Sequence, residues 1–251
     1  SVLWNDIGYP ASADLPALFA HYYNTVPDGL VNDRFRQRFS LEAQELAEPK
    51  ADHHFDYTTP EYETYAEITE QKWEATRGIG YSFGYNRNEG PEQYLSVRDI
   101  VHSFVDIVSK NGNLLLNVGP MADGTIPDLQ RERLVGLGVW LGVHGEAIFD
   151  TRPWVVAEGT ANGGVGVRFT QRRDTLYATL LAEPSVGELT LERLRASEGA
   201  QIRLLGREDL LPWTQTDGGL TVAIPAPIPD AIRGAPAHTL TISPQPRMSR
   251  S

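Results

Sequence analysis

Short apolar runs alternate with stretches of helical periodicity through the first 150 residues. Residues 2–4 are apolar and precede Asp6, Gly8 and Pro10, which predicts a short buried strand that ends at a carboxylate and a turn. Asp14 can cap a following helix. The buried face of that helix would be formed by Leu15, Leu18, Phe19, Tyr22 and Tyr23. With another short strand at 30–34, the order strand, helix, strand predicts a parallel pair joined by a right-handed crossover.

The same alternation continues after a polar segment at 35–72, which predicts a long loop with one helical turn around 41–46. Aromatic and aliphatic residues alternate with small ones over 78–85, which predicts a strand. Ser96 and Asp99 have the spacing of a capping box before an amphipathic helix. The apolar face of that helix consists of Ile100, Val101, Phe104, Val105 and Val108. Residues 114–118 are continuously apolar, as in a strand covered on both faces, and Pro127 suits the first turn of a further helix.

The periodicity changes near residue 152. Beyond it helical spacing is absent, and turns rich in Gly, Pro and Asp separate short strands. These predicted strands cover 165–170, 175–181, 188–191, 201–205, 220–224 and 238–242. Strands of this length and spacing are typical of an antiparallel β-sandwich. We therefore predict an α/β domain at 1–152 and a β-sandwich domain at 153–251, with a loose tail at 243–251.

The α/β segment contains about four strand–helix units. A (β/α)8 barrel needs eight units, and half a barrel would expose two parallel edge strands and an unfilled interior. An open sheet is the alternative, but we favour a barrel whose other half comes from missing sequence or from another chain. The chain also begins at Ser1, without an initiator Met and directly on a core-like strand. We therefore expect that upstream sequence is missing and that a targeting segment could have been lost with it.

Composition narrows the possible partners. The 251 residues carry a formal net charge of -11, which disfavours nucleic acid and anionic membranes as partners. The sequence has no cysteine, so disulfides, thiol catalysis and thiolate metal sites are excluded. No apolar run approaches the ~20 residues of a membrane-spanning helix. The compartment, cytoplasmic or secreted, is left open.

Candidate chemistry gathers at the predicted strand ends and in the polar segment. Asp6, Asp33 with Arg34, and Glu61 are accompanied by many aromatic residues. Two carboxylates among aromatic platforms are what glycoside hydrolysis requires. The alternatives remain that Asp6 caps a turn, that Glu61 is a solvated carboxylate, and that the aromatics are core residues. A metal site at 53–56 is a weak possibility, because the His pair lies in a loop, and we predict neither a metal nor an organic cofactor.

Six stretches of the first 152 residues resemble bacterial α-L-fucosidases of glycoside hydrolase family 29. They are 3–10 (LWNDIGYP), 31–34 (VNDR), 59–62 (TPEY), 72–86 (KWEATRGIGYSFGYN), 113–120 (NLLLNVGP) and 123–127 (DGTIP). The resemblance implies the C-terminal part of a (β/α)8-like barrel followed by the family's β-sandwich. It also implies a fucosylated oligosaccharide or glycoconjugate as substrate, and a separate N-terminal barrel fragment or an oligomer partner to complete the site.

Carried over residue by residue, the resemblance gives five assignments. Asp6 would be the nucleophile, and Glu61 would be the general acid/base. Arg34 would bind near the nucleophile or the sugar, and Trp4 and Phe83 would line the fucose pocket. The acid/base position varies most within the family, so other carboxylates compete with Glu61. These rivals are Glu63, Glu67 and Glu74, of which Glu74 could instead be structural.

Two departures from the family pattern are apparent. The segment 36–54 is longer than the usual connection, and the histidines and tryptophan of the family's N-terminal barrel half are not in this chain. The resulting hypothesis is a retaining exo-α-L-fucosidase represented by its C-terminal portion. The alternatives are a non-catalytic carbohydrate-binding or structural fragment and, more weakly, an enzyme acting on α-L-galactosides.

Overall fold

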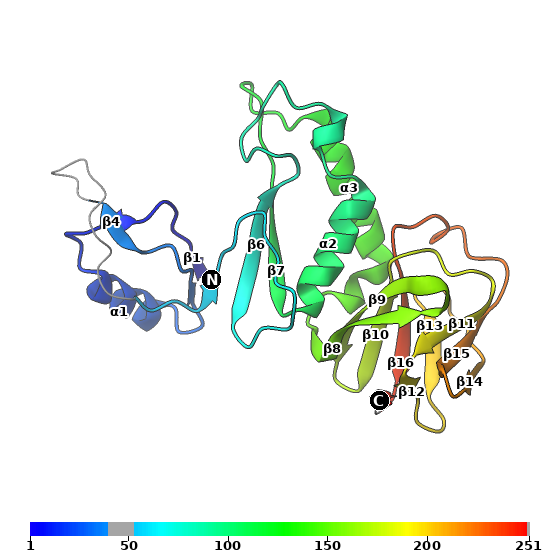
Figure 1. Cartoon of the computed structure of the whole chain (residues 1–251). Coiled ribbons are helices and arrows are strands. Elements are labelled where there is room, and N and C mark those ends of the chain that lie inside the picture. Colours follow the sequence, from blue (N-terminus) through cyan, green and yellow to red (C-terminus); the bar gives the residue numbers. More distant parts are fainter. Residues whose placement is uncertain (40–52, 250–251) are drawn as a thin grey trace. The chain divides into compact units, whose positions relative to one another are not determined.

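The computed structural model describes residues 1–39 and 53–249 (Figure 1). Its contacts divide the chain into two compact units. The first unit comprises Ser1–Thr64 with Glu70–Thr76, and the second comprises Tyr65–Thr69 with Arg77–Ser251. The predicted domain boundary near residue 152 stays a prediction.

In the first unit, one helix connects two parallel strands that pair with each other. β1 (Val2–Leu3) pairs in parallel with β3 (Leu30–Val31), and α1 (Leu15–Thr25) lies between them in the chain. The side chain of Asp14 caps α1 by accepting a hydrogen bond from the Ala17 N–H at 3.0 Å. The predicted order of strand, helix and parallel strand is confirmed. The expectation of a fully buried first strand is wrong, because the side chain of Val2 is 54% exposed.

Parallel pairing continues along this unit. β5 (Tyr57–Thr58) pairs in parallel with the start of β6 (Lys72–Gly78), and a parallel bridge joins Asn32, just after β3, to Tyr57. A second parallel bridge joins Glu61 to Thr76. β1, β3, β5 and β6 therefore follow one another as parallel neighbours. Outside this row, β2 (Tyr9–Pro10) pairs in parallel with β4 (Gln37–Phe39).

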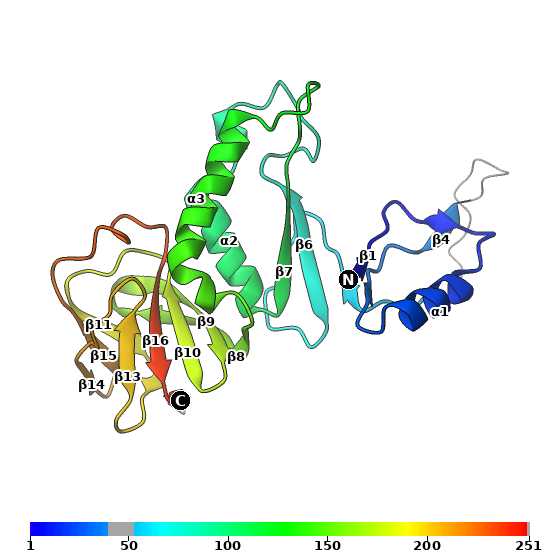
Figure 2. The same cartoon turned by 180° about the vertical axis from the view of Figure 1, so that it is seen from behind.

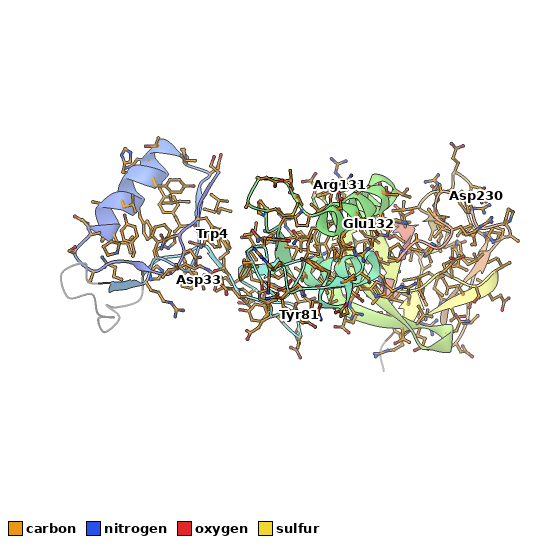
Figure 3. The ribbon with its side chains drawn as sticks, turned by 90° about the horizontal axis from the view of Figure 1, so that it is seen from above. Trp4, Asp33, Tyr81, Arg131, Glu132 and Asp230 are labelled. Carbon is orange, nitrogen blue, oxygen red and sulfur yellow. The ribbon has the colours of Figure 1, made fainter. Side chains whose placement is uncertain are left out.

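The predicted strand at 78–85 is wrong. The strand here is β6, and residues 79–85 form bends and irregular backbone. Tyr81, which is labelled in Figure 3, is 72% exposed. In β6 the buried residues Trp73 and Ala75 alternate with polar residues. Because several of these polar residues are charged, the sequence around 72–78 does not predict a strand. The predicted long loop at 35–72 contains β4 and β5, and its predicted helical turn at 41–46 lies outside the described residues.

The second unit begins with two helices and one strand. α2 (Val97–Ser109) and α3 (Asp128–His144) pack side by side (Figures 1 and 2), and β7 (Gly112–Asn117) contacts α2. The capping box at Ser96 is confirmed: its hydroxyl accepts a hydrogen bond from the Asp99 N–H at 3.1 Å. Short 3₁₀ turns at Pro91–Gln93, Gly145–Ala147 and Asn162–Gly164 complete this part. Leu115 in β7 is 40% exposed, so the expectation of a strand covered on both faces is wrong.

Eight strands of the second unit form one antiparallel sheet, in the order β13-β16-β10-β9-β8-β11-β15-β14 (Figure 2). They are β8 (Arg152–Ala161), β9 (Val165–Arg172), β10 (Thr175–Leu180), β11 (Gly187–Glu192), β13 (Gln201–Leu204), β14 (Trp213–Gln215), β15 (Gly219–Ile224) and β16 (His238–Ser243). All six predicted strands are confirmed, and β8 and β14 are additional. The sheet encloses an aliphatic core, which is consistent with the predicted β-sandwich.

The predicted loose tail is wrong in part. β17 (Arg247–Met248) pairs with β12 (Leu194–Arg195), so the described residues of the tail are tied to the domain. The barrel itself remains a prediction, since the parallel strands of the first unit form an open row. No helix in the described ranges is both long and apolar enough to cross a membrane.

A buried histidine at the end of α3 makes stability depend on pH. His144 is 1% exposed, neither ring nitrogen has a hydrogen-bond partner among the described residues, and its ring stacks on Trp140. Burial, and then the nearby His238, lowers the pKa of His144 from 6.5 to about 4. Between these two values the unfolded chain binds a proton that the folded chain does not. Acidification through this range must therefore destabilise the fold.

We expect the free energy of unfolding to fall by up to about 1.4 kcal/mol per pH unit between pH 6.5 and 4 because of His144. His144→Leu should reduce this dependence, since leucine does not titrate and carries no polar atom. The neighbouring His238, whose pKa burial also lowers, keeps its own contribution. Urea unfolding at a series of pH values measures the slope. The control is His21→Gln, which changes an exposed histidine on α1. An equally steep slope in His144→Leu would contradict the assignment.

Candidate active site

Asp6 lies in the turn that follows β1. Its Oδ1 atom accepts hydrogen bonds from the Ile7 N–H and from Arg34 Nη1, each at 2.8 Å. Ile7 has a φ of +65°, and Gly8 has a φ of +120°. A β-branched residue in the left-handed region is an outlier that costs energy. The turn thus holds Asp6 in place at the expense of local strain, and its side chain stays 53% exposed.

Glu61 stands in a similar turn after β5. Tyr62, which follows it, has a φ of +53°, so both carboxylates directly precede a residue in the left-handed conformation. The bridge to Thr76 fixes the backbone of Glu61, and its side chain is 46% exposed. Strained backbone of this kind clusters at functional sites.

Arg34 joins the two carboxylates. Its Nη1 atom donates to Asp6 Oδ1 and also contacts Glu61 Oε1. Burial would lower the pKa of Arg34, but its hydrogen bonds to Glu61 and Asp6 outweigh burial and raise that pKa. Arg34 therefore remains a cation between two carboxylates, and its side chain is only 15% exposed.

Thr59 orients the guanidinium of Arg34. Arg34 Nε donates to Thr59 Oγ1 at 2.7 Å, and Nη2 donates to the Thr59 carbonyl oxygen at 2.8 Å. Asp33 in turn accepts hydrogen bonds from the Thr59 hydroxyl at 2.6 Å and from its backbone N–H at 3.0 Å. These bonds leave Nη1 to face the carboxylates. Sequence reasoning missed Thr59, although its place beside Glu61 in the TPEY stretch was a usable signal.

An open pocket of about 380 Å³ lies beside Arg34 and the two carboxylates. It is lined by Asp6, Ile7, Gly8, Asp33, Arg34, Arg36, Thr59 and Glu61. The rim thus comes from the turns after three successive parallel strands, β1, β3 and β5. Parallel strands bring their carboxyl ends to one edge of a sheet, which is where α/β proteins keep their binding sites.

The Trp4 ring contacts the guanidinium of Arg34. Arg34 Cζ stands 5.1 Å from the centroid of the Trp4 ring, within the range of a cation–π contact. The indole Nε1 donates to Glu74 Oε1 in β6 at 3.3 Å. In Figure 3, Trp4 and Asp33 lie at the same end of the first unit. The structure therefore brings Asp6, Arg34, Glu61 and Trp4 together.

Phe83 belongs to the second unit, so its predicted place beside the carboxylates stays untested. Its carbonyl oxygen accepts a hydrogen bond from Asn117 Nδ2 at 2.5 Å. Of the rival carboxylates, Glu63 is exposed, Glu67 lies in the second unit, and Glu74 contacts Trp4. Glu61, with which these three carboxylates compete, contacts Arg34 Nη1.

The predicted weak metal site is part of a small polar cluster. His54 Nε2 lies 3.4 Å from Asp56 Oδ1 and 3.0 Å from the hydroxyl of Tyr23. Asp56 also accepts a hydrogen bond from the Val31 N–H at 2.7 Å. Within 1–39 and 53–249, no three His, Asp or Glu residues are grouped so that they could hold a metal ion. The cluster ties α1, β3 and the segment before β5 together.

Two carboxylates beside one pocket are the groups that most glycoside hydrolases use. In agreement with this site, residues 1–146 match the sequence model of the family described as alpha-L-fucosidase, and residues 162–243 match the model described as alpha-L-fucosidase C-terminal domain. The chain therefore belongs to the α-L-fucosidase family, glycoside hydrolase family 29.

Relatives occur among both animal and bacterial proteins. An alpha-L-fucosidase of Branchiostoma floridae is 38% identical over 160 residues, which cover 63% of this chain and 35% of the relative. Human tissue alpha-L-fucosidase is 32% identical over 227 residues, which cover 88% of this chain and 46% of the relative. The solved structure of the Thermotoga maritima alpha-fucosidase with a mechanism-based inhibitor is 40% identical, with a TM-score of 0.81.

Coverage of these relatives is partial. The match includes 96% of this chain but 52% of the Thermotoga chain, and the chain spans less than half the length of the curated relatives named above.

Proposed function

We propose that this chain carries the catalytic carboxylates of a retaining exo-α-L-fucosidase. The observation that carries the proposal is the shared contact of Asp6 and Glu61 with one nitrogen atom, Arg34 Nη1. Two oxygens that contact the same nitrogen cannot be farther apart than two hydrogen-bond lengths, about 6 Å. Retaining glycosidases hold their carboxyl groups ~5–5.5 Å apart and inverting enzymes ~6.5–9.5 Å apart. The contact therefore favours retention.

The reaction follows from the two carboxylates. Asp6 attacks the anomeric carbon of the fucosyl group and forms an ester bond as the glycosidic bond breaks. Glu61 donates a proton to the leaving oxygen in this step. In the second step Glu61 removes a proton from water, which attacks the same carbon and releases Asp6 as a carboxylate. Arg34 releases Glu61 from its ion pair when the sugar enters between the two carboxylates.

Relatives support fucose as the sugar that is recognised. Structures of the Thermotoga maritima alpha-fucosidase, 40% identical to this chain, are described in complex with fucose and with a mechanism-based inhibitor. In our proposal Trp4 and Phe83 line the fucose pocket, and a terminal fucosyl residue of an oligosaccharide or glycoconjugate is the substrate. Apolar ring faces suit the C–H side of a sugar.

The rest of the sugar site is proposed to come from outside this chain. β1, β3, β5 and β6 form an open row, and the chain matches about half of the Thermotoga structure. A polypeptide corresponding to the unmatched half would add the remaining strands and close a (β/α)8 barrel, whether as a separate fragment, as an oligomer partner or as part of the same protein.

The test is hydrolysis of an aryl α-L-fucoside by the chain alone and by the chain mixed with that complementary polypeptide. We expect release of the phenol in the mixture, with the α anomer of fucose appearing first in proton NMR spectra. Initial appearance of the β anomer would refute retention. Sugar binding without hydrolysis in either preparation would instead identify a non-catalytic carbohydrate-binding fragment. Preferential hydrolysis of an α-L-galactoside would reassign the substrate.

A further inference from the structure

Glu74 is a half-buried carboxylate that the proposed reaction does not use. It lies in β6, the strand next to β5, and its Oε1 atom accepts the indole hydrogen bond of Trp4 at 3.3 Å. The two residues are 70 positions apart in the sequence. Because an indole has a single N–H donor, this bond fixes which way the Trp4 ring is turned.

The other contact of the Trp4 ring is with Arg34. The guanidinium carbon lies 5.1 Å from the ring centroid, and the same guanidinium holds Asp6 and Glu61 through Nη1. A chain of contacts thus leads from Glu74 to the Trp4 ring, from the ring to Arg34, and from Arg34 to both carboxylates. Trp4 is the link between Glu74 and Arg34 in this chain of contacts.

We propose that Glu74 is a positioning residue that sets the orientation of the Trp4 ring and, through it, the placement of Arg34 between Asp6 and Glu61. This inference rests on the proposed function only for its kinetic consequences. The contact between Glu74 and Trp4 can be tested in the chain whether or not the chain hydrolyses a fucoside.

The electrostatic surroundings of Glu74 agree with this role. Burial raises the pKa of Glu74, and the hydrogen bond from Trp4 and the positive charge of Arg34 partly oppose that rise. The indole N–H and the guanidinium therefore favour the ionised form of Glu74. The buried hydroxyl of Tyr57 has no hydrogen-bond partner among the described residues. Burial, and then the negative charge of Glu74, raises the pKa of Tyr57.

The first experiment follows the Trp4 indole N–H in ¹H–¹⁵N NMR spectra of the chain. Its resonance is assigned by its absence in Trp4→Phe. We expect the resonance to move with pH as Glu74 titrates and to lose that titration in Glu74→Gln, whose amide oxygen still accepts the bond but carries no charge. Asp28→Asn, which changes an exposed carboxylate of the same unit, is the control and should leave the titration unaltered.

A wild-type indole resonance that does not titrate, or one that titrates equally in Glu74→Gln, overturns the contact. This experiment uses only Trp4→Phe, Glu74→Gln and Asp28→Asn, so it does not depend on whether the more disruptive variant Glu74→Leu folds. The other titratable groups close to Trp4 through Arg34 are Asp6 and Glu61, and both are retained in Glu74→Gln. A titration that survives in this variant would belong to them.

The second experiment is a kinetic double-mutant cycle in whichever preparation hydrolyses the aryl fucoside. We expect Glu74→Leu to lower kcat/KM by about tenfold to a hundredfold, because small misplacements of catalytic groups have effects of this size. Glu74→Gln should retain most of the activity. Adding Glu74→Leu to Trp4→Phe should cause little further loss, since Glu74 acts through the indole N–H.

The outcomes separate the two proposals. Fully additive losses in the cycle would overturn the positioning role, because Glu74 would then act independently of Trp4. If neither preparation hydrolyses a fucoside, the proposed function fails, while the NMR titration still decides whether Glu74 holds Trp4. If the indole titration is lost in Glu74→Gln but the kinetic losses of Glu74→Leu and Trp4→Phe are additive, the hydrogen bond exists but has no role in catalysis.

Discussion

Replacing Asp6 by glycine should abolish turnover of an aryl α-L-fucoside, lowering kcat by a factor of about 10⁴ or more, as loss of a covalent nucleophile does in other enzymes. The glycine leaves Arg34 and Glu61 in contact but removes the group that forms the fucosyl-enzyme. The side chain of Asp6 is 53% exposed, so the fold should tolerate the change. The rate in the complemented preparation is the measurement, with unfolding curves to verify the fold.

Azide makes this prediction specific to the nucleophile. In Asp6→Gly, azide can enter the space of the lost carboxylate and attack the anomeric carbon directly, which gives the β-fucosyl azide. In Glu61→Gln, azide would intercept the covalent intermediate instead and give the α-fucosyl azide. The configuration of the product thus reports which carboxylate was removed. Asp28→Gly, an exposed turn variant, should behave as wild type. Wild-type rates in Asp6→Gly would show that the nucleophile lies elsewhere.

The second large effect is expected for stability at Asp106 in α2. Asp106 Oδ1 accepts hydrogen bonds from Arg168 Nε at 2.5 Å and from Lys110 Nζ at 2.9 Å. Lys110 also contacts Glu158 Oε1 at 2.8 Å, and its side chain is only 7% exposed. This network ties α2 to β8 and β9. Removing one partner from a largely buried ion network is costly. Without Asp106, the cations Lys110 and Arg168 would share one carboxylate, that of Glu158, whose side chain is 47% exposed.

Asp106→Leu should therefore lower the free energy of unfolding by about 3–5 kcal/mol, measured by urea denaturation followed by circular dichroism. The double variant Asp106→Leu with Lys110→Met should recover part of this loss, because Glu158 then has only the Arg168 cation to balance. Asp128→Asn is the matched control. It breaks an ion pair with Arg131 whose aspartate is 95% exposed, and such pairs contribute less than about 1 kcal/mol. Equal losses in Asp106→Leu and Asp128→Asn would refute the importance of burial here.

Local signals in the sequence predicted the elements that depend on local physics. Asp14 and the Ser96–Asp99 box were readable because a cap and its helix lie within four residues of each other. The six strands after residue 164 were readable because alternation and turn residues are also local. β6 was misplaced because its polar positions point away from Trp73 and Ala75, and the apolar alternation just beyond it gave a stronger but misleading signal.

The site shows the same division. The family resemblance selected Asp6, Arg34 and Glu61 as separate positions, whereas their joint contact depends on three parallel strands that bring distant turns to one edge. Thr59 and Asp33 act through hydrogen bonds across 25 and 26 positions, which no periodicity reports. Exposure of Leu115 was equally invisible, because an apolar run reads the same whether or not its second face is covered.

The sequence by itself determined three things: the family, the chemistry available at Asp6 and Glu61, and the change from α/β to antiparallel β structure. Each of these depends only on residue types and on short spacings along the chain. The tertiary structure decided that one nitrogen of Arg34 serves both carboxylates, that strained residues follow each of them, and that Glu74 reaches Trp4. The reason is physical: side-chain contacts between strands depend on register and backbone direction, which are set by packing of the whole unit.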